Sequence, residues 1–77
     1  MNYTLKVANG DYASLDLEKS GNKYLVLCYV YGYGITFKRE FDNYEEANTY
    51  YLAKCEISHV TPVEVDHDPD ELLTNVY

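Results

Sequence analysis

The chain has 77 residues, enough for one small domain with a single hydrophobic core and too few for two lobes around a deep catalytic cleft. Its hydrophobic content of 47% and aromatic content of 16%, with ten tyrosines, exclude a disordered chain. The net charge of −7 disfavours direct binding to nucleic acids or membrane surfaces, because these are themselves negative.

Residues 3–7 alternate apolar and polar side chains, and the alternation resumes after Asn9-Gly10, which predicts a β-hairpin. The loop length decides which side chains share a face of that hairpin. A two-residue loop would mix the faces. A three-residue loop ending at Gly10 sets Leu5 opposite Ala13 and keeps the apolar residues together, so we expect this register.

A second hairpin is predicted after a turn at residues 19–23. Residues 24–31 are apolar at nearly every position, as expected for a central strand that is covered on both faces, or on one face by tyrosine. Glycines at both ends of residues 32–34 break this run, and residues 35–41 alternate again as a fourth strand. Arg39 falls in the apolar phase of that strand, so we expect it near the sheet margin with its head in water.

A helix is predicted to begin at Asp42, whose side chain would cap it while Glu45 reaches back. Its core face would be a stripe at helical spacing, flanked by Leu52. The stripe consists of Tyr44, Ala47, Tyr51 and Cys55. The residues expected to point away from the core are Glu45, Glu46, Thr49 and Glu56. The helix should end before His59. A short edge strand is then expected near Val63.

Residues 66–77 form an acidic segment with two alternative interpretations. Asp68 followed by Pro69, with Glu71 three residues after the aspartate, predicts a short capped helix. The alternative is a mobile tail that orders only on binding. Residues 1–77 are thus expected to form a single α+β domain. Its antiparallel sheet has four to five strands in two hairpins, with one helix packed on it and a short carboxy-terminal helical turn.

Charge is segregated along the chain. Residues 1–39 carry five basic and three acidic residues, and residues 40–77 carry ten acidic residues against Lys54 alone, so +2 and −9 sum to −7. Such a surface attracts basic proteins, among which nucleic-acid-binding proteins are the largest class. The alternative is that the acidity only keeps the domain soluble. The residues expected to bind a partner are Glu45, Glu46, Glu56, Asp66, Asp68, Asp70 and Glu71.

The sequence offers no convincing catalytic, metal or cofactor site. Alternate aspartates in residues 66–70 are typical of the start of a calcium loop, but Glu71 replaces the required glycine and Tyr77 replaces the closing glutamate. Cys28 and Cys55 are far apart and are expected to be reduced thiols in the core of a cytoplasmic protein. We therefore expect a non-enzyme without cofactors, with no signal peptide and no membrane segment.

In size, charge and layout of hairpins and helix, Asn2 to Ile57 resembles the small acidic inhibitors that phages and mobile elements use against host defence nucleases, such as anti-CRISPR and anti-restriction proteins. The resemblance implies an inhibitor that acts in the host cytoplasm and blocks a basic, nucleic-acid-binding protein. The alternative is a homo-oligomeric structural module, such as a homodimer. It would assemble through a free sheet edge or through Tyr29, Tyr31 and Tyr33.

Overall fold

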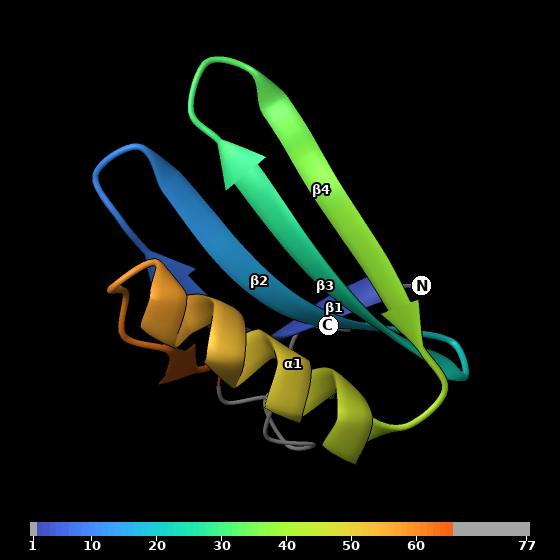
Figure 1. Ribbon diagram of the computed structural model, residues 1–77. Coiled ribbons are helices and arrows are strands. Elements are labelled where there is room, and N and C mark those ends of the chain that lie inside the picture. The colour runs from blue at the N-terminus through green and yellow to red at the C-terminus, as the bar shows by residue number, and fades with distance from the viewer. Residues whose placement is uncertain (1, 66–77) are drawn as a thin grey trace, which may run out of the picture.

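A computed structural model describes residues 2–65 as one antiparallel sheet with a single helix lying across it (Figure 1). The strand order is β4-β3-β2-β1-β5. The elements are β1 (Asn2–Asn9), β2 (Ala13–Ser20), β3 (Lys23–Val30), β4 (Gly34–Phe41), α1 (Tyr44–Ile57) and β5 (Val63–Glu64). The predicted α+β class, its two hairpins, its helix and its short edge strand are confirmed. The helical turn predicted after Asp68 lies outside the described residues.

The hydrophobic core lies between α1 and one face of the sheet. Leu17, Val26 and Tyr51 are completely buried there. The other buried members of the core are Ala8, Leu15, Ala47 and Cys55. Three of the four predicted stripe residues therefore face the sheet. The buried core residues come from β1, β2, β3 and α1. The core therefore depends on contacts between residues that are far apart in sequence.

The flanks of the helix stripe differ from the prediction. Tyr44 is 38% exposed and Leu52 is 41% exposed, so both lie outside the buried core. Tyr50 packs against the core instead, with its ring centroid 6.0 Å from that of Phe37 and 5.3 Å from that of Phe41. The helix thus contacts the aromatic residues of β4 at that edge of the sheet. The spacing of apolar residues within the helix does not predict this contact.

The predicted register of the first hairpin is wrong. Leu5 does not pair with Ala13; Ala8 lies opposite Leu15, and the turn follows Gly10, whose N–H donates to the Ala13 carbonyl at 2.8 Å. Ala8 is fully buried in the hydrophobic core, where a larger side chain would have to displace its neighbours. A register shift at Leu5 then allows the rest of β1 to continue pairing.

The prediction for β4 is wrong at Ile35, because this strand also contains a register shift. Phe37 and Phe41 lie on the helix side as expected, with Arg39 between them on an edge strand of the sheet. Ile35 does not share that face. It pairs with Tyr29 beyond the shift and is 62% exposed. One extra residue in a strand moves every preceding side chain to the other face, so the alternation breaks at this point.

The helix begins one residue later than predicted. Asn43 is the capping residue, and its Oδ1 accepts a hydrogen bond from the Glu46 N–H at 2.9 Å. Asp42 instead forms an ion pair with Lys23 of the second turn. Both residue types cap helices well, so the sequence alone does not show which of the two is the cap. In the folded chain Asp42 pairs with Lys23, and Asn43 caps the helix. The helix ends at Ile57, before His59, as predicted.

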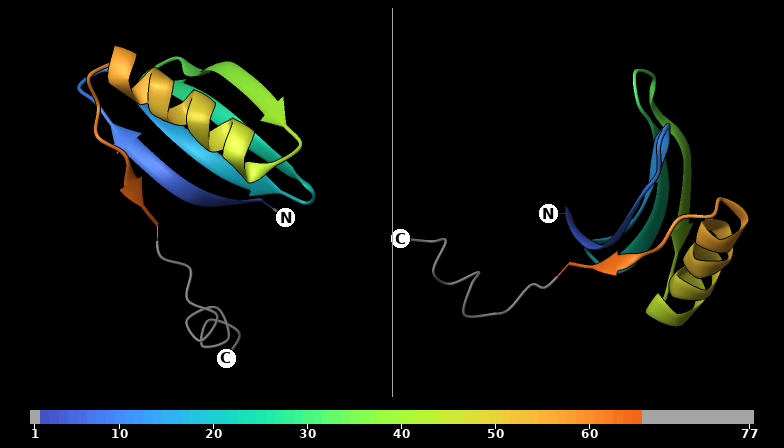
Figure 2. Two further views of the ribbon diagram at one scale, coloured as in Figure 1. Left: turned by 60° about the horizontal axis from the view of Figure 1, so that its bottom comes forward. Right: turned by 90° about the vertical axis from the view of Figure 1, so that its left-hand side faces the viewer.

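The two faces of the sheet have different environments. Seen edge-on in Figure 2, the sheet has α1 on one side and bends away from it, so the opposite face is concave. No described element packs on this face. The sheet therefore presents one surface that is sealed by the helix and a second that is uncovered within residues 2–65.

Candidate protein-binding surface

A shallow groove lies along α1 beside the end of β4. Its volume is ≈ 640 Å³. The lining residues, here called the acidic groove, are Phe41, Glu45, Glu46, Thr49, Tyr50 and Ala53. Phe41 and Tyr50 supply aromatic rings, and the two glutamates are exposed in the first turn of the helix. Carboxylates beside aromatic rings suit an arginine or lysine, whose stem packs on the ring while its head pairs with a carboxylate.

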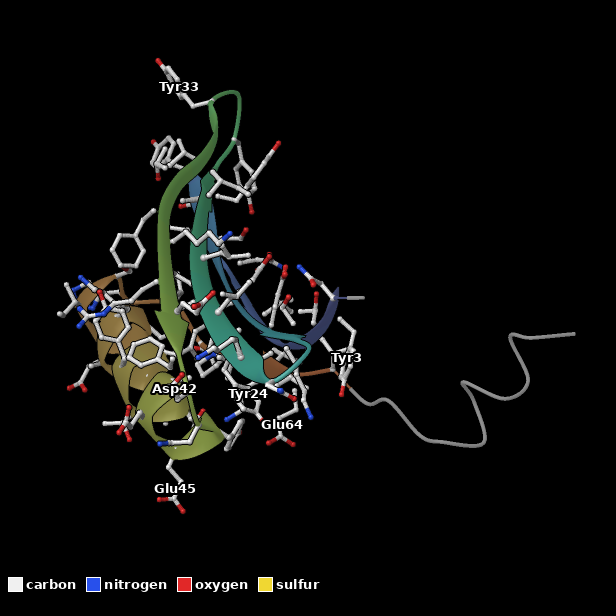
Figure 3. All side chains as sticks on the ribbon, turned by 90° about the vertical axis from the view of Figure 1, so that its right-hand side faces the viewer. Tyr3, Tyr24, Tyr33, Asp42, Glu45 and Glu64 are labelled. Carbon is white, nitrogen blue, oxygen red and sulfur yellow. The ribbon has the colours of Figure 1, made fainter. Side chains whose placement is uncertain are left out.

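The two glutamates of the acidic groove form no ion pair with a described residue, although Arg39 and Lys54 lie over the Tyr50 ring. The ion pair found among residues 2–65 joins Lys23 to Asp42 and involves neither Glu45 nor Glu46. Figure 3 shows Asp42 and Glu45 toward the end of the molecule opposite the hairpin tip that carries Tyr33. Exposed Glu45 therefore remains available to an external cation at this end of the molecule, whereas Asp42 is already paired with Lys23.

Most basic residues are held against aromatic rings on the helix side of the sheet. At these distances each cation is attracted by the electron-rich face of its ring. Lys6 also donates a hydrogen bond to Asn48 Oδ1 at 2.7 Å. The cations therefore leave most exposed carboxylates without a partner. The contacts, to ring centroids, are Lys6 over Tyr44 (5.7 Å), Lys19 over Tyr24 (5.6 Å), Arg39 over Tyr50 (4.9 Å) and Lys54 over Tyr50 (5.4 Å).

The structure brings together some of the predicted binding residues and separates others. Glu45 and Glu46 share the acidic groove, whereas Glu56 is exposed in the last turn of α1. Ten residues of helix place Glu56 about 15 Å along the axis from Glu46. The predicted residues Asp66, Asp68, Asp70 and Glu71 lie outside the described residues.

The sequence prediction missed the two aromatic residues of the groove. Tyr50 follows Glu46 by four residues, so both lie on the same side of the helix. That spacing is a usable signal for the pair. Phe41 has no such signal, because only the packing of β4 against α1 brings it to the groove.

Cys55 lies in the hydrophobic core, and Cys28 packs against it. Cys55 is 2% exposed in the core, and burial raises the pKa of its thiol, which keeps it protonated and a poor nucleophile. Cys28 is half-buried in β3, and neither cysteine forms a disulfide in the described chain. Among residues 2–65, no group of three or more His, Cys, Asp or Glu side chains is arranged to hold a metal ion.

A second exposed surface lies at the hairpin turns. Tyr12 is 82% exposed and Tyr33 is 86% exposed, while Tyr31 is about half exposed. The N–H of Tyr31 donates to the carbonyl of Tyr12 at 3.0 Å, which links the two turns. Exposed tyrosines on a hydrogen-bonded scaffold offer contact area at a small entropic cost.

Comparison with protein-family models, curated proteins and solved structures finds no match to this chain. Across residues 2–65, none of the helical structure is both long enough and apolar enough to cross a membrane. The class that the described residues define is an α+β domain with an acidic groove on its helix.

Two carboxyl groups on the uncovered face of the sheet sit in unfavourable surroundings. Burial raises the pKa of Asp16. Burial, followed by the nearby Asp16 charge, raises the pKa of Glu18, and Lys38 partly opposes the shift. An acid with a raised pKa in the folded state destabilises the fold when it is ionised. This destabilisation is complete above the raised pKa and disappears as the pH falls below the ordinary value of 3.8.

We therefore expect Asp16→Asn to stabilise the protein near neutral pH. The gain in free energy of unfolding should be on the order of 0.5 kcal/mol, because solvent screens a partly exposed carboxylate. At about pH 3 the gain should vanish, since the carboxyl group is then protonated in both states. Urea unfolding followed by circular dichroism at the two pH values measures both quantities. Asp11→Asn in the exposed first turn is the charge-matched control, and an equal gain there would contradict the burial explanation.

Proposed function

We propose that this chain is a cytoplasmic protein-binding inhibitor that occupies the cationic, nucleic-acid-binding surface of another protein. Inhibitors of the anti-CRISPR and anti-restriction type are the class that it resembles. The observation that carries the proposal is the acidic groove, in which exposed Glu45 and Glu46 lie beside aromatic rings without an ion-pair partner among residues 2–65.

Binding of this kind follows from the chemistry of the groove. Arginine or lysine side chains that normally contact phosphate would instead form charge-assisted hydrogen bonds with the two glutamates. Their stems would pack beside Tyr50 and Phe41, next to Arg39, which already lies over both rings. The remaining negative charge would repel nucleic acid from the occupied surface, so that the inhibitor and the nucleic acid compete for one site.

Affinity capture followed by a competition assay tests the proposal. The immobilised chain is used to retain proteins from bacterial lysate, and a retained protein is purified and titrated with the chain and with its nucleic acid. We expect the two to compete and the affinity of the chain to fall with rising salt. Glu45→Gln combined with Glu46→Gln should weaken the complex about tenfold or more.

The control is Asp11→Asn combined with Glu64→Gln, which removes the same charge outside the acidic groove. This variant should retain most of the affinity, because long-range attraction is only slightly reduced. Simultaneous binding of the chain and the nucleic acid to the retained protein would contradict inhibition by occupation. An affinity that does not depend on salt would contradict the role of charge.

A homo-oligomeric module is the second candidate, favoured by two observations. The outer side of β4 is unpaired in the described sheet, and Tyr33 and Ile35 are exposed beside it. However, β4 contains a register shift and carries Lys38 and Arg39, which are features that oppose edge pairing. The inhibitor therefore remains the first proposal. Light scattering decides the second, since a monomer at high concentration would reject it.

A further inference from the structure

The uncovered face of the sheet has a defined set of side chains. Leu15 and Leu17 of β2 point into the core, so Ser14, Asp16 and Glu18 point to the opposite face. Pairing with β3 places their neighbours on this face as well. The residues of this concave face used below are Ser14, Asp16, Glu18, Leu25, Leu27 and Tyr29.

This face is less hydrated than an ordinary solvent-facing surface. Leu25 is 4% exposed and Leu27 is 8% exposed, although neither belongs to the core beneath the helix. Ser14, which pairs with Tyr29 of β3 on the same face, is also only 8% exposed. The face therefore combines two nearly buried leucines with polar side chains that stay within reach of a binding partner.

The two carboxylates lie among these apolar neighbours. Asp16 pairs with Leu27 on one side and Val7 on the other, and Glu18 pairs with Leu25. Neither forms an ion pair with a described residue, and Lys38 of β4 is the nearby cation that acts on Glu18. Burial raises the pKa of both carboxyl groups, so a cation placed between them would relieve an unfavourable state of the free protein.

We propose that the concave face of the sheet is a docking surface for a cationic segment of another protein. An arginine or lysine of that segment lies between Asp16 and Glu18, and its apolar side chains contact Leu25, Leu27 and Tyr29. This surface is on the opposite side of the sheet from α1. The inference is therefore independent of the acidic groove and of the inhibitor proposal, which depends on Glu45 and Glu46.

Charge favours a cationic segment of another protein over two alternatives, a second copy of this chain and the chain's own segment after Val65. A second copy would present its own Asp16 and Glu18 to the same carboxylates if the two concave faces met. The segment after Val65 adds four acidic residues and no basic residue other than His67. Both would bring negative charge to a negative surface, whereas a cationic segment complements it.

Nuclear magnetic resonance with the full chain tests the docking surface directly. The probe is a short synthetic peptide in which arginine and leucine alternate, and the comparison peptide has glutamate in place of arginine. We expect the arginine peptide to shift backbone amide signals of residues 14–18 and 25–29, and the glutamate peptide to shift none. Asp16→Asn combined with Glu18→Gln should raise the dissociation constant about tenfold or more.

The matched control is Glu45→Gln combined with Glu46→Gln, which removes the same charge from the other surface. It should change the affinity for the peptide less than about threefold. Equal weakening by the two pairs, or shifts confined to α1, would overturn the proposal. Signals of residues 14–18 that move on dilution without peptide would assign the face to a second copy and would also overturn it. Unchanged amide signals elsewhere show that each variant remains folded.

Discussion

Tyr51→Ala is expected to unfold most of the protein at moderate denaturant, with a loss of about 3–5 kcal/mol in free energy of unfolding. Tyr51 is the largest completely buried side chain, and it lies at the centre of the contact between α1 and the sheet. A domain of this size has a total stability of only about 4–12 kcal/mol. The loss is therefore a large share of the total, and urea unfolding followed by circular dichroism measures it.

Tyr51→Phe separates packing from hydrogen bonding at the same position. The Tyr51 hydroxyl donates to the Leu15 carbonyl at 2.8 Å within the core. Burial raises the pKa of Tyr51, with smaller contributions from Cys55 and Asp16, so the donor proton is retained. Phenylalanine keeps the ring and loses this bond, and it should cost about 1 kcal/mol. If Tyr51→Phe lost as much free energy of unfolding as Tyr51→Ala, packing of the ring would not be the main contribution of Tyr51 to stability.

Ala47→Leu is expected to destabilise the protein by about 1–3 kcal/mol, because the extra side chain must be accommodated between two layers that already touch. Ala47 is fully buried on the side of α1 that faces the sheet. A small residue at this position allows the helix and the sheet to approach closely. Thermal and urea unfolding of the variant measure the loss.

Ala53→Leu is the matched control for this prediction. Ala53 lies on the same helix, but its side chain is exposed in the lining of the acidic groove. The substitution adds the same volume and leaves helix propensity nearly unchanged, so the effect should stay within about 0.5 kcal/mol. Similar losses for the two variants would show that volume at Ala47 is not limiting.

The helix shows how far local pattern determines structure. The spacing of Ala47, Tyr51 and Cys55 identified the buried stripe, and all three are buried. The cap predicted from the sequence, Asp42, lies one residue before the observed cap, Asn43. The two residue types cap helices equally well, and only the ion pair of Asp42 with Lys23 distinguishes them. That ion pair joins positions 19 residues apart, which no local pattern contains.

The strands show where pattern fails. Each strand was located, but the alternation in β1 and β4 assumed continuous pairing, and both strands contain a register shift. A shift depends on how the side chains of the whole sheet fit together, with small Ala8 in the core and Ile35 moved to the other face. Such a fit is a property of the packed layers and not of the strand in which the shift occurs.

The candidate sites divide in the same way. Composition and helical spacing are sufficient to predict that the second half of the chain is acidic and that Glu45 and Glu46 face outward. The position of these glutamates beside Phe41 and Tyr50 depends on the packing of β4 against α1 and is seen only in the folded chain. Only the tertiary structure places most cations against aromatic rings, since ring contacts depend on distances between elements.

The tertiary structure changed the role of β2 most. Asp16 and Glu18 were two alternating polar residues of a hairpin in a half of the chain with a net charge of +2. In the folded chain they pair with Leu27 and Leu25 of β3, respectively. These neighbours leave the two carboxylates partly buried on a face of the sheet that no described element covers. The sequence sets which charges the chain carries. The packing of the sheet sets how strongly water stabilises each one, and so where a partner would gain most by binding.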